Sequence, residues 1–166
     1  MRSSATTPPT KFFVPGVPKT KNNKRAFSIG GKARVVPGKD AAKKQAAFQA
    51  VAIEHAPKVP TQAPVKLVLG FAFTPPKGYP KWKREAALAG EWQKTTKPDV
   101  SRLVTFCEDC LSGLFFVDDA QVVEIHARCF FSERPGTSVE VITIPQALSP
   151  REKKAARAAV AVGEAS

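Results

Sequence analysis

Six acidic residues crowd into one short stretch of an otherwise basic chain. They lie between residues 99 and 124, where Arg102 is the only basic residue beside them. Residues 1–97 hold 19 of the 26 Lys and Arg residues and only four acids. Neighbouring carboxylates repel each other, and a bound divalent cation removes that cost. The pattern predicts a metal-dependent reaction on a phosphate ester, in which the basic residues hold the phosphates.

Three aspartates are the first candidates for catalysis and metal binding. Asp99 opens a predicted helix, and Asp118 and Asp119 open the strand that follows it. Twelve helical residues travel ~18 Å away from Asp99, and four extended residues return ~13 Å, so a site within one chain is plausible but not forced. Taken singly, Asp99 is more typical of a helix N-cap, and the Asp118–Asp119 pair of a turn.

Basic and aromatic residues form candidate contacts to nucleic acid at three places. The candidates are Lys19, Lys21, Lys24 and Arg25 in one loop, Lys81, Lys83 and Arg84 around Trp82, and Arg102 in the acidic stretch. Lys and Arg position a phosphate backbone, while an aromatic side chain can stack on an unpaired base. For Trp82 the alternative is a packed core anchor. The four cations of residues 151–157 are more typical of a solvated helix face.

Size and composition fit one globular domain. The 166 residues are 43% hydrophobic, and the formal net charge is +12 with a pI near 9.9. Such a surplus favours an anionic polymer as the partner. No secretory signal and no apolar run of ~20 residues is visible, so no membrane association is expected. Three cysteines form no even disulfide set, which suits a reducing cytoplasm.

The periodicity predicts a mixed α/β (α+β) single domain. The expected elements are strands at 11–14 and around 26–29, a helix at 40–55 with Asp40 as N-cap, a strand at 65–73, a long polar connection at 74–98, a helix at 100–111 stopped by Gly113, and a hairpin-like pair of strands at 121–131 and 137–144. A capping box at residues 149–152 begins an appended helix that runs to about residue 162. We therefore expect a tail at 1–10, a domain at 11–145, and a basic C-terminal helix and tail at 146–166.

Several motifs resemble the RusA family of Holliday-junction resolvases. They are Lys97-Pro98-Asp99-Val100-Ser101-Arg102-Leu103, the later Asp118-Asp119-Ala120-Gln121-Val122, the upstream Phe13-Val14-Pro15-Gly16-Val17-Pro18-Lys19, and the lysine-rich Pro80–Ala87 segment of phage-type members. The resemblance covers residues 11–144. It implies a RusA-like ββαβαββ fold and Mg²⁺-dependent cleavage of four-way DNA junctions by a homodimer, with Mn²⁺ as a possible substitute and no small-molecule cofactor. The expected location is the cytoplasm of a bacterial or phage-infected cell. Asp99, Asp118 and Asp119 match the positions that organise the metal and the attacking water.

The chain departs from the family pattern beside Asp99. Ser101 and Arg102 stand where the family has Asp and Asn, and Thr105 stands where it has Lys. Losing a carboxylate weakens metal binding. Glu108 is a possible substitute because it shares a helix face with Ser101 and Thr105, although it lies ~10 Å along the axis from Ser101. The alternative function is therefore a junction-binding protein with weakened or lost catalysis.

Two other classes of protein compete with a nuclease. Cys107-x2-Cys110 with His126-x2-Cys129 imitates a zinc spacing, but the first pair lies on the apolar stripe of a helix. His126 and Cys129 also have opposite parity along a strand and so face opposite sides of a sheet. A plain basic structural protein is the third alternative, and it would not prefer branched over linear DNA.

Overall fold

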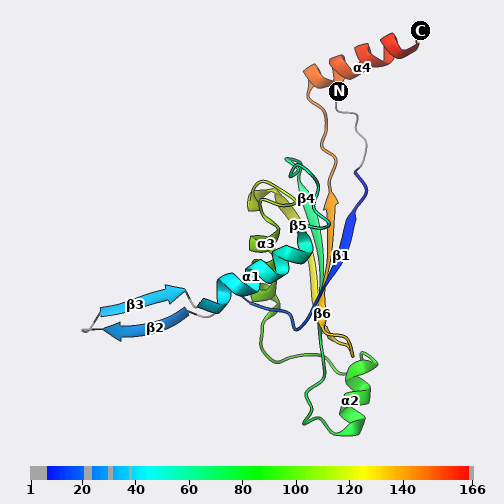
Figure 1. Ribbon diagram of the computed structural model, residues 1–166. Helices are drawn as coiled ribbons and strands as arrows, with labels where there is room; N and C mark the ends of the chain where they lie inside the picture. Colours follow the sequence, from blue (N-terminus) through cyan, green and yellow to red (C-terminus); the bar gives the residue numbers. More distant parts are fainter. Residues whose placement is uncertain (1–6, 21–23, 30–31, 38, 165–166) are drawn as a thin grey trace.

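The computed structural model describes residues 7–20, 24–29, 32–37 and 39–164. Its centre is a four-stranded sheet made of β1 (Thr10–Pro15), β4 (Val65–Phe73), β5 (Val122–Phe131) and β6 (Gly136–Thr143). The strand order is β1-β6-β4-β5, as Figure 1 shows. The β4–β5 pair is parallel, and the other two pairs are antiparallel. The four strands predicted at 11–14, 65–73, 121–131 and 137–144 are thus confirmed, each within one residue at either end.

The predicted hairpin-like pairing of the last two strands is wrong. β4 lies between β5 and β6 and pairs with both. The short connection crosses the end of β4, where the Ser132 N–H donates to the Phe73 carbonyl at 2.8 Å. The Pro135–Gly136 signal marked a true reversal of direction. A turn of that length, however, fits a step over an intervening strand as well as a hairpin.

Two helices cover the same face of the sheet. They are α1 (Lys39–Ala52) and α3 (Val100–Leu111), and Figure 1 shows them side by side. α3 has its predicted bounds, and Gly113 follows it with a positive φ of 82°. α1 ends earlier than expected, and Asp40 lies in its first turn rather than at the N-cap. A carboxylate there still complements the helix dipole.

The core forms between these helices and the inner face of the sheet. Its most enclosed members include Leu67, Leu69 and Phe71 from β4, Leu103, Cys107, Cys110 and Leu111 from α3, and Phe48 and Ala52 from α1. The outer face of the sheet is less enclosed. Lys66 and Val68, which alternate with the buried residues of β4, are only half-buried. The sheet therefore has one face packed against helices and one face that the described helices leave open.

Two elements were missed in the sequence. A separate two-stranded sheet, β2 (Lys24–Ile29) and β3 (Lys32–Pro37), projects beside α1 in Figure 1. Part of β2 was expected, around residues 26–29. β3 was not expected, because it is short and ends at a proline. The connection expected at 74–98 contains the short helix α2 (Lys81–Leu88). Its eight residues carry one buried side chain, Ala87, too few for an apolar stripe.

The appended helix α4 (Pro150–Glu164) is present as predicted. Its capping box is formed, because the Ser149 N–H donates to Glu152 Oε2 at 2.8 Å and the Glu152 N–H donates to Ser149 Oγ at 3.3 Å. The fold class is confirmed as mixed α+β with a C-terminal helix. Among the residues described, no helix combines the length and apolarity needed to cross a bilayer.

Candidate active site and nucleic-acid interface

Gln121 holds the turn that carries the two candidate aspartates. Its Oε1 accepts hydrogen bonds from the Val117 and Asp118 N–H groups, each at 2.9 Å. Its Nε2 donates to the carbonyls of Thr61 and Ala63, each at 2.8 Å. One side chain thus ties the turn to the strand-like segment before β4. Gln121 is a positioning residue that spacing alone did not reveal, although it belongs to the quoted motif.

The two adjacent aspartates have different roles in this turn. Asp118 is the N-cap of the 3-10 turn Asp119–Gln121, and its Oδ1 accepts from the Ala120 N–H at 2.8 Å. Asp119 is exposed, and its carboxylate makes no hydrogen bond or ion pair with another described residue. The role expected of an aspartate in a turn is therefore filled by Asp118, whereas Asp119 presents its carboxylate to solvent.

Glu108 lies close enough to Asp119 for the two carboxylates to interact. Partial burial raises the pKa of Glu108, and the negative charges of Asp119 and then Asp109 raise it further. Such a pair of repelling carboxylates is a donor set that fits a divalent cation, since Mg²⁺ often takes one or two protein carboxylates. The expected proximity of Asp119 to Glu108 agrees with this interaction.

Replacing Glu108 with Gln is expected to stabilise the metal-free protein at neutral pH. Because its pKa is raised on folding, the stabilisation linked to its protonation is present at low pH and is lost as pH rises through the folded-state pKa. The melting temperature in EDTA should therefore rise for Glu108→Gln at pH 7, and the gain should vanish near pH 4. Mg²⁺ should raise the melting temperature of the original chain more than that of the variant.

The exposed acid Glu133, on the connection between β5 and β6, provides the control. Glu133→Gln should leave both the pH dependence and the response to Mg²⁺ unchanged. Equal Mg²⁺ responses in the Glu108→Gln variant and the original chain would remove Glu108 from the metal site.

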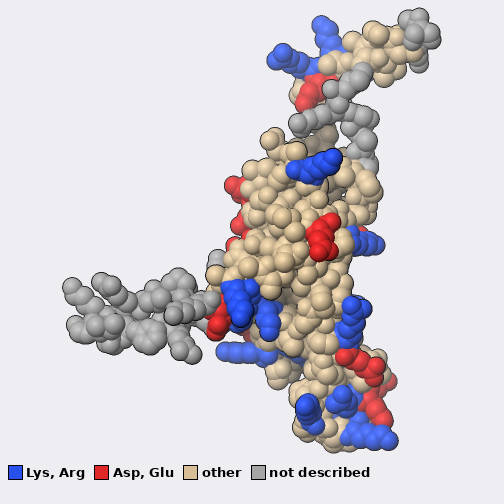
Figure 2. All heavy atoms as spheres, in the orientation of Figure 1, with Lys and Arg blue, Asp and Glu red and all other residues tan. Residues whose placement is uncertain are grey.

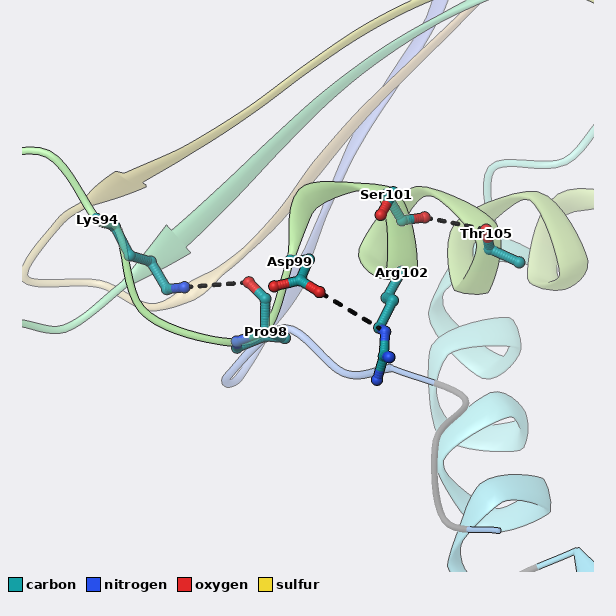
Figure 3. Close-up of polar contacts among 6 residues, drawn as sticks. All are labelled: Lys94, Pro98, Asp99, Ser101, Arg102 and Thr105. Atoms are coloured by element: carbon teal, nitrogen blue, oxygen red, sulfur yellow. Dashed lines mark hydrogen bonds and ion pairs between the residues drawn. The ribbon is translucent and has the colours of Figure 1, made fainter.

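Asp99 begins α3 without capping it. It occupies the N-cap position, but its side chain makes no capping hydrogen bond. Instead its Oδ2 lies 3.7 Å from Arg102 Nε, and Figure 3 shows the carboxylate directed toward that guanidinium. An exposed pair of this kind contributes little to stability. The usual structural explanation for an aspartate at this position, a cap, therefore does not apply.

Lys94 anchors the loop that leads into Asp99. Its Nζ donates to the Thr96 carbonyl at 2.6 Å and to the Pro98 carbonyl at 3.2 Å, the latter drawn in Figure 3. The same ammonium lies 4.4 Å from the centre of the Phe73 ring, at the end of β4. Lys94 thus fixes the start of α3 beside the C-terminal end of β4. This role could not be predicted from the sequence, because Lys94 is one lysine among many.

Asp99 and Asp119 lie toward opposite ends of the β4–α3–β5 unit. Asp99 follows the C-terminal end of β4, whereas Gln121 ties Asp119 to the segment just before Val65. The 12 residues of α3 run between these ends, a length of ~18 Å. Within the described residues, no three His, Cys, Asp or Glu side chains gather closely enough to hold a metal ion. A single chain therefore does not unite the two ends around one ion, as the sequence had left possible.

The residues that depart from the family pattern lie on the exposed side of α3. Thr105 Oγ1 donates to the Ser101 carbonyl at 2.9 Å, a bond within the helix (Figure 3). Both side chains are exposed, and neither brings a carboxylate or a cation to the start of the helix. Arg102 is the charged neighbour that Asp99 has there instead.

The segment before Asp99 carries an exposed basic and aromatic cluster. We call it the α2 cluster, formed by Tyr79, Trp82, Lys83 and Trp92. Trp82 is 61% exposed and meets Trp92 edge to face, with 6.0 Å between ring centres. Lys83 Nζ lies 4.2 Å from the Tyr79 ring centre and 4.4 Å from that of Trp92. The alternative that Trp82 is a core anchor is wrong.

The surface around this cluster carries many cations with some acids among them. Figure 2 shows Lys and Arg over α2 beside Asp and Glu, and Lys and Arg again at the end of α1 near the loop after β1. Lys81 and Arg84 are exposed on α2, and Lys19 is exposed on that loop. Lys21 lies outside the described residues, as do the side chains of Lys24 and Arg25, whose backbone forms β2. Those residues predicted to contact DNA whose side chains the structure describes therefore lie on the protein surface.

The zinc spacing does not correspond to a site. Cys107 and Cys110 are fully buried in the core, and burial raises the pKa of the Cys107 thiol. His126 and Cys129 pair with Val68 and Phe71 of β4, so they face opposite sides of the sheet as expected. A structural zinc site would need these four side chains on one side, which the fold does not provide.

Comparison with known proteins finds a matching family and a similar bacterial protein. A family model described as "Endodeoxyribonuclease RusA" matches residues 15–142. A relative in Bacillus subtilis (strain 168), "Uncharacterized protein YqaN", is 33% identical over 136 residues, which cover 79% of this chain and 94% of the relative.

Proposed function

Because the chain belongs to the RusA endodeoxyribonuclease family, we propose that it resolves four-way DNA junctions by Mg²⁺-dependent hydrolysis of phosphodiester bonds. The observation that carries the proposal is the exposed Asp119 carboxylate, held in a turn by the Gln121 hydrogen bonds and the Asp118 cap on a protein of net charge +12. Burial and the negative charge of Asp119 raise the pKa of the nearby Glu108. We assign the nuclease to residues 11–145, with a tail at 1–10 and a separate C-terminal helix at 146–166.

Asp119 and Glu108 are the proposed metal ligands, and Asp118 supports Asp119 by capping its turn. A bound Mg²⁺ would supply a Lewis acid that neutralises charge on the scissile phosphate and lowers the pKa of a bound water. Mn²⁺ has similar ligand preferences and should substitute. The exposed cations of α2 and the β1 loop hold the flanking phosphates, so they orient the DNA without reading its sequence.

We further propose that the protein acts as a homodimer and that Asp99 of a second copy completes the site. A twofold axis running across the strands would bring the Asp99 end of each copy beside the Asp119 end of the other, creating two equal sites. Two equal sites also suit symmetric cleavage of a junction.

The test compares a labelled four-way junction with a linear duplex of the same sequence. In Mg²⁺ or Mn²⁺ the junction should be cut and the linear duplex should not, and EDTA should stop the reaction. Cleavage of both substrates at equal rates would contradict the assignment.

A second candidate function is junction binding without cleavage. Ser101 and Thr105 favour it, because they bring no charge to the start of α3. This candidate predicts tight, salt-dependent binding of the junction and no product at any divalent concentration.

Replacing Trp82 with Ala is expected to weaken junction binding by about 5- to 30-fold, since stacking on an unpaired base contributes roughly 1–2 kcal/mol. Its exposed ring needs no repacking, so the melting temperature should change little. Fluorescence anisotropy with a labelled junction gives the affinity. Trp82→Phe keeps a ring for stacking and should bind nearly as well as the original chain. Equal affinities for all three proteins would rule out stacking by Trp82.

A further inference from the structure

Helix α4 stands apart from the rest of the protein. In Figure 1 it follows an extended segment after β6 and packs against neither the sheet nor the helices that cover it. Its described side chains are nearly all exposed, including Val160 at 62% and Val162 at 74%. The family match ends at residue 142, before this helix begins. A role for α4 must therefore be sought in its own residues.

One face of α4 is strongly basic. Arg151, Lys154 and Arg157 follow one another at three-residue spacing and so share one side of the helix. Lys153, four residues before Arg157, widens this basic side. None of the four forms an ion pair with another described residue. Glu152, the acid within this run, accepts the Ser149 N–H of the capping box. The helix therefore presents a row of cations to solvent.

The opposite face offers little for a protein partner. Ala155, Ala159 and Val162 recur there at helical spacing. Alanine side chains bury little apolar area, so this face would contribute little free energy to packing. An isolated helix of this length is also marginal in water, and a partner that neutralised its cations would stabilise it. The charge, rather than the apolar face, points to the partner.

The end of the sheet from which α4 departs is the end that carries Asp119. Thr143, the last residue of β6, pairs with Val65, and Val65 also pairs with Val122 at the start of β5. The α2 cluster and Asp99 lie toward the other end, beyond Phe73. The basic face of α4 and the α2 cluster therefore lie toward opposite ends of the sheet, measured along its strands.

We propose that α4 is a second DNA contact, whose basic face binds the phosphate backbone of duplex DNA leaving the Asp119 end of the protein. The proposal rests on the proposed function for its partner, but the contact itself requires only duplex phosphates. It adds affinity without sequence preference, because phosphate contacts carry no base information.

The experiment measures binding of the full chain to a 30-base-pair linear duplex and to a four-way junction over a range of salt concentrations. The test variant is Arg151→Gln/Lys153→Gln/Lys154→Gln/Arg157→Gln, in which Gln keeps a high helix propensity. The control, Ala155→Ser/Val160→Ser/Val162→Ser, alters the apolar positions and retains every cation. Circular dichroism reports whether both variants keep their helix content.

The quadruple variant should bind both DNAs at least about 10-fold more weakly at 50 mM salt, and its salt slope should fall by up to ~3.6, or ~0.9 for each lost phosphate contact. The control should bind like the original chain. Equal slopes for the quadruple variant and the original chain would overturn the proposal. A loss of DNA binding confined to the control would also overturn the proposal, because the apolar positions of α4 rather than its cations would then be required. A chain that binds linear duplex through α4 without preferring the junction would contradict the proposed function alone.

Discussion

Replacing Asp119 with Asn is expected to reduce Mg²⁺-dependent cleavage of a four-way junction by about 1,000-fold, equivalent to ~4 kcal/mol of transition-state stabilisation. The Asp119 carboxylate is exposed and makes no hydrogen bond or ion pair within the described chain, so its removal should cost little stability. Single-turnover cleavage of a labelled junction measures the rate. Anisotropy without metal should show that the variant still binds the junction.

The neighbouring residue supplies a matched control. Asp118 caps its turn through one accepted hydrogen bond to the Ala120 N–H, and Asn is an equally good N-cap. Asp118→Asn should therefore cleave within a few-fold of the original rate. Equal losses in both variants would mean that the turn, rather than the Asp119 carboxylate, is what cleavage requires. Full activity in Asp119→Asn would refute the proposed metal site.

Two inactive variants are expected to restore activity when they share a dimer. Asp99→Asn and Asp119→Asn should each be inactive alone. In a mixed dimer, the Asp119→Asn chain supplies an intact Asp99 and the Asp99→Asn chain supplies an intact Asp119, so one of the two sites is complete. Random pairing after co-expression should return about a quarter of the original cleavage rate, because half of the dimers are mixed and each has one intact site.

The separation of the two aspartates by the length of α3 is the reason for expecting this recovery. If the site formed within one chain, every site in the mixed dimer would contain one substitution and the mixture would stay inactive. Different affinity tags on the two chains confirm that mixed dimers are present. The matched control is a mixture of Asp119→Asn chains with Glu108→Gln chains, which should not recover, because both residues belong to the same end of one chain.

Most elements of the fold could be predicted because their sequences have a clear period or composition. Val65–Phe73 is apolar except for Lys66, and Val100–Leu111 has an apolar stripe between an aspartate and a glycine. β3 and α2 were missed because each is short and depends on its neighbours, as α2 does through the buried Ala87. The pairing of β5 with β4 could not be predicted from turn residues, since they fix a reversal of direction and not the partner strand.

The candidate site could be predicted only in part. The motifs identified Asp99, Asp119 and the neighbouring Gln121, but their spacing did not fix which side chains meet. That depends on the parallel register of β4 and β5, which carries Asp119 back to the opposite end of α3 from Asp99. The positioning roles of Lys94 and Gln121 are tertiary, because their partners Phe73 and Thr61 lie far away in the sequence.

Strand β1 has a consequence for synthesis of the chain. Among the described strands, residues 10–15 pair with β6 alone, at residues 136–141, so β1 leaves the ribosome long before its neighbour is made. β1 must therefore wait unpaired until β6 has emerged, and its apolar residues stay available to chaperones during that interval. A ribosome-bound chain stopped before residue 136 should be cut by protease within β1, whereas the released protein should be protected there.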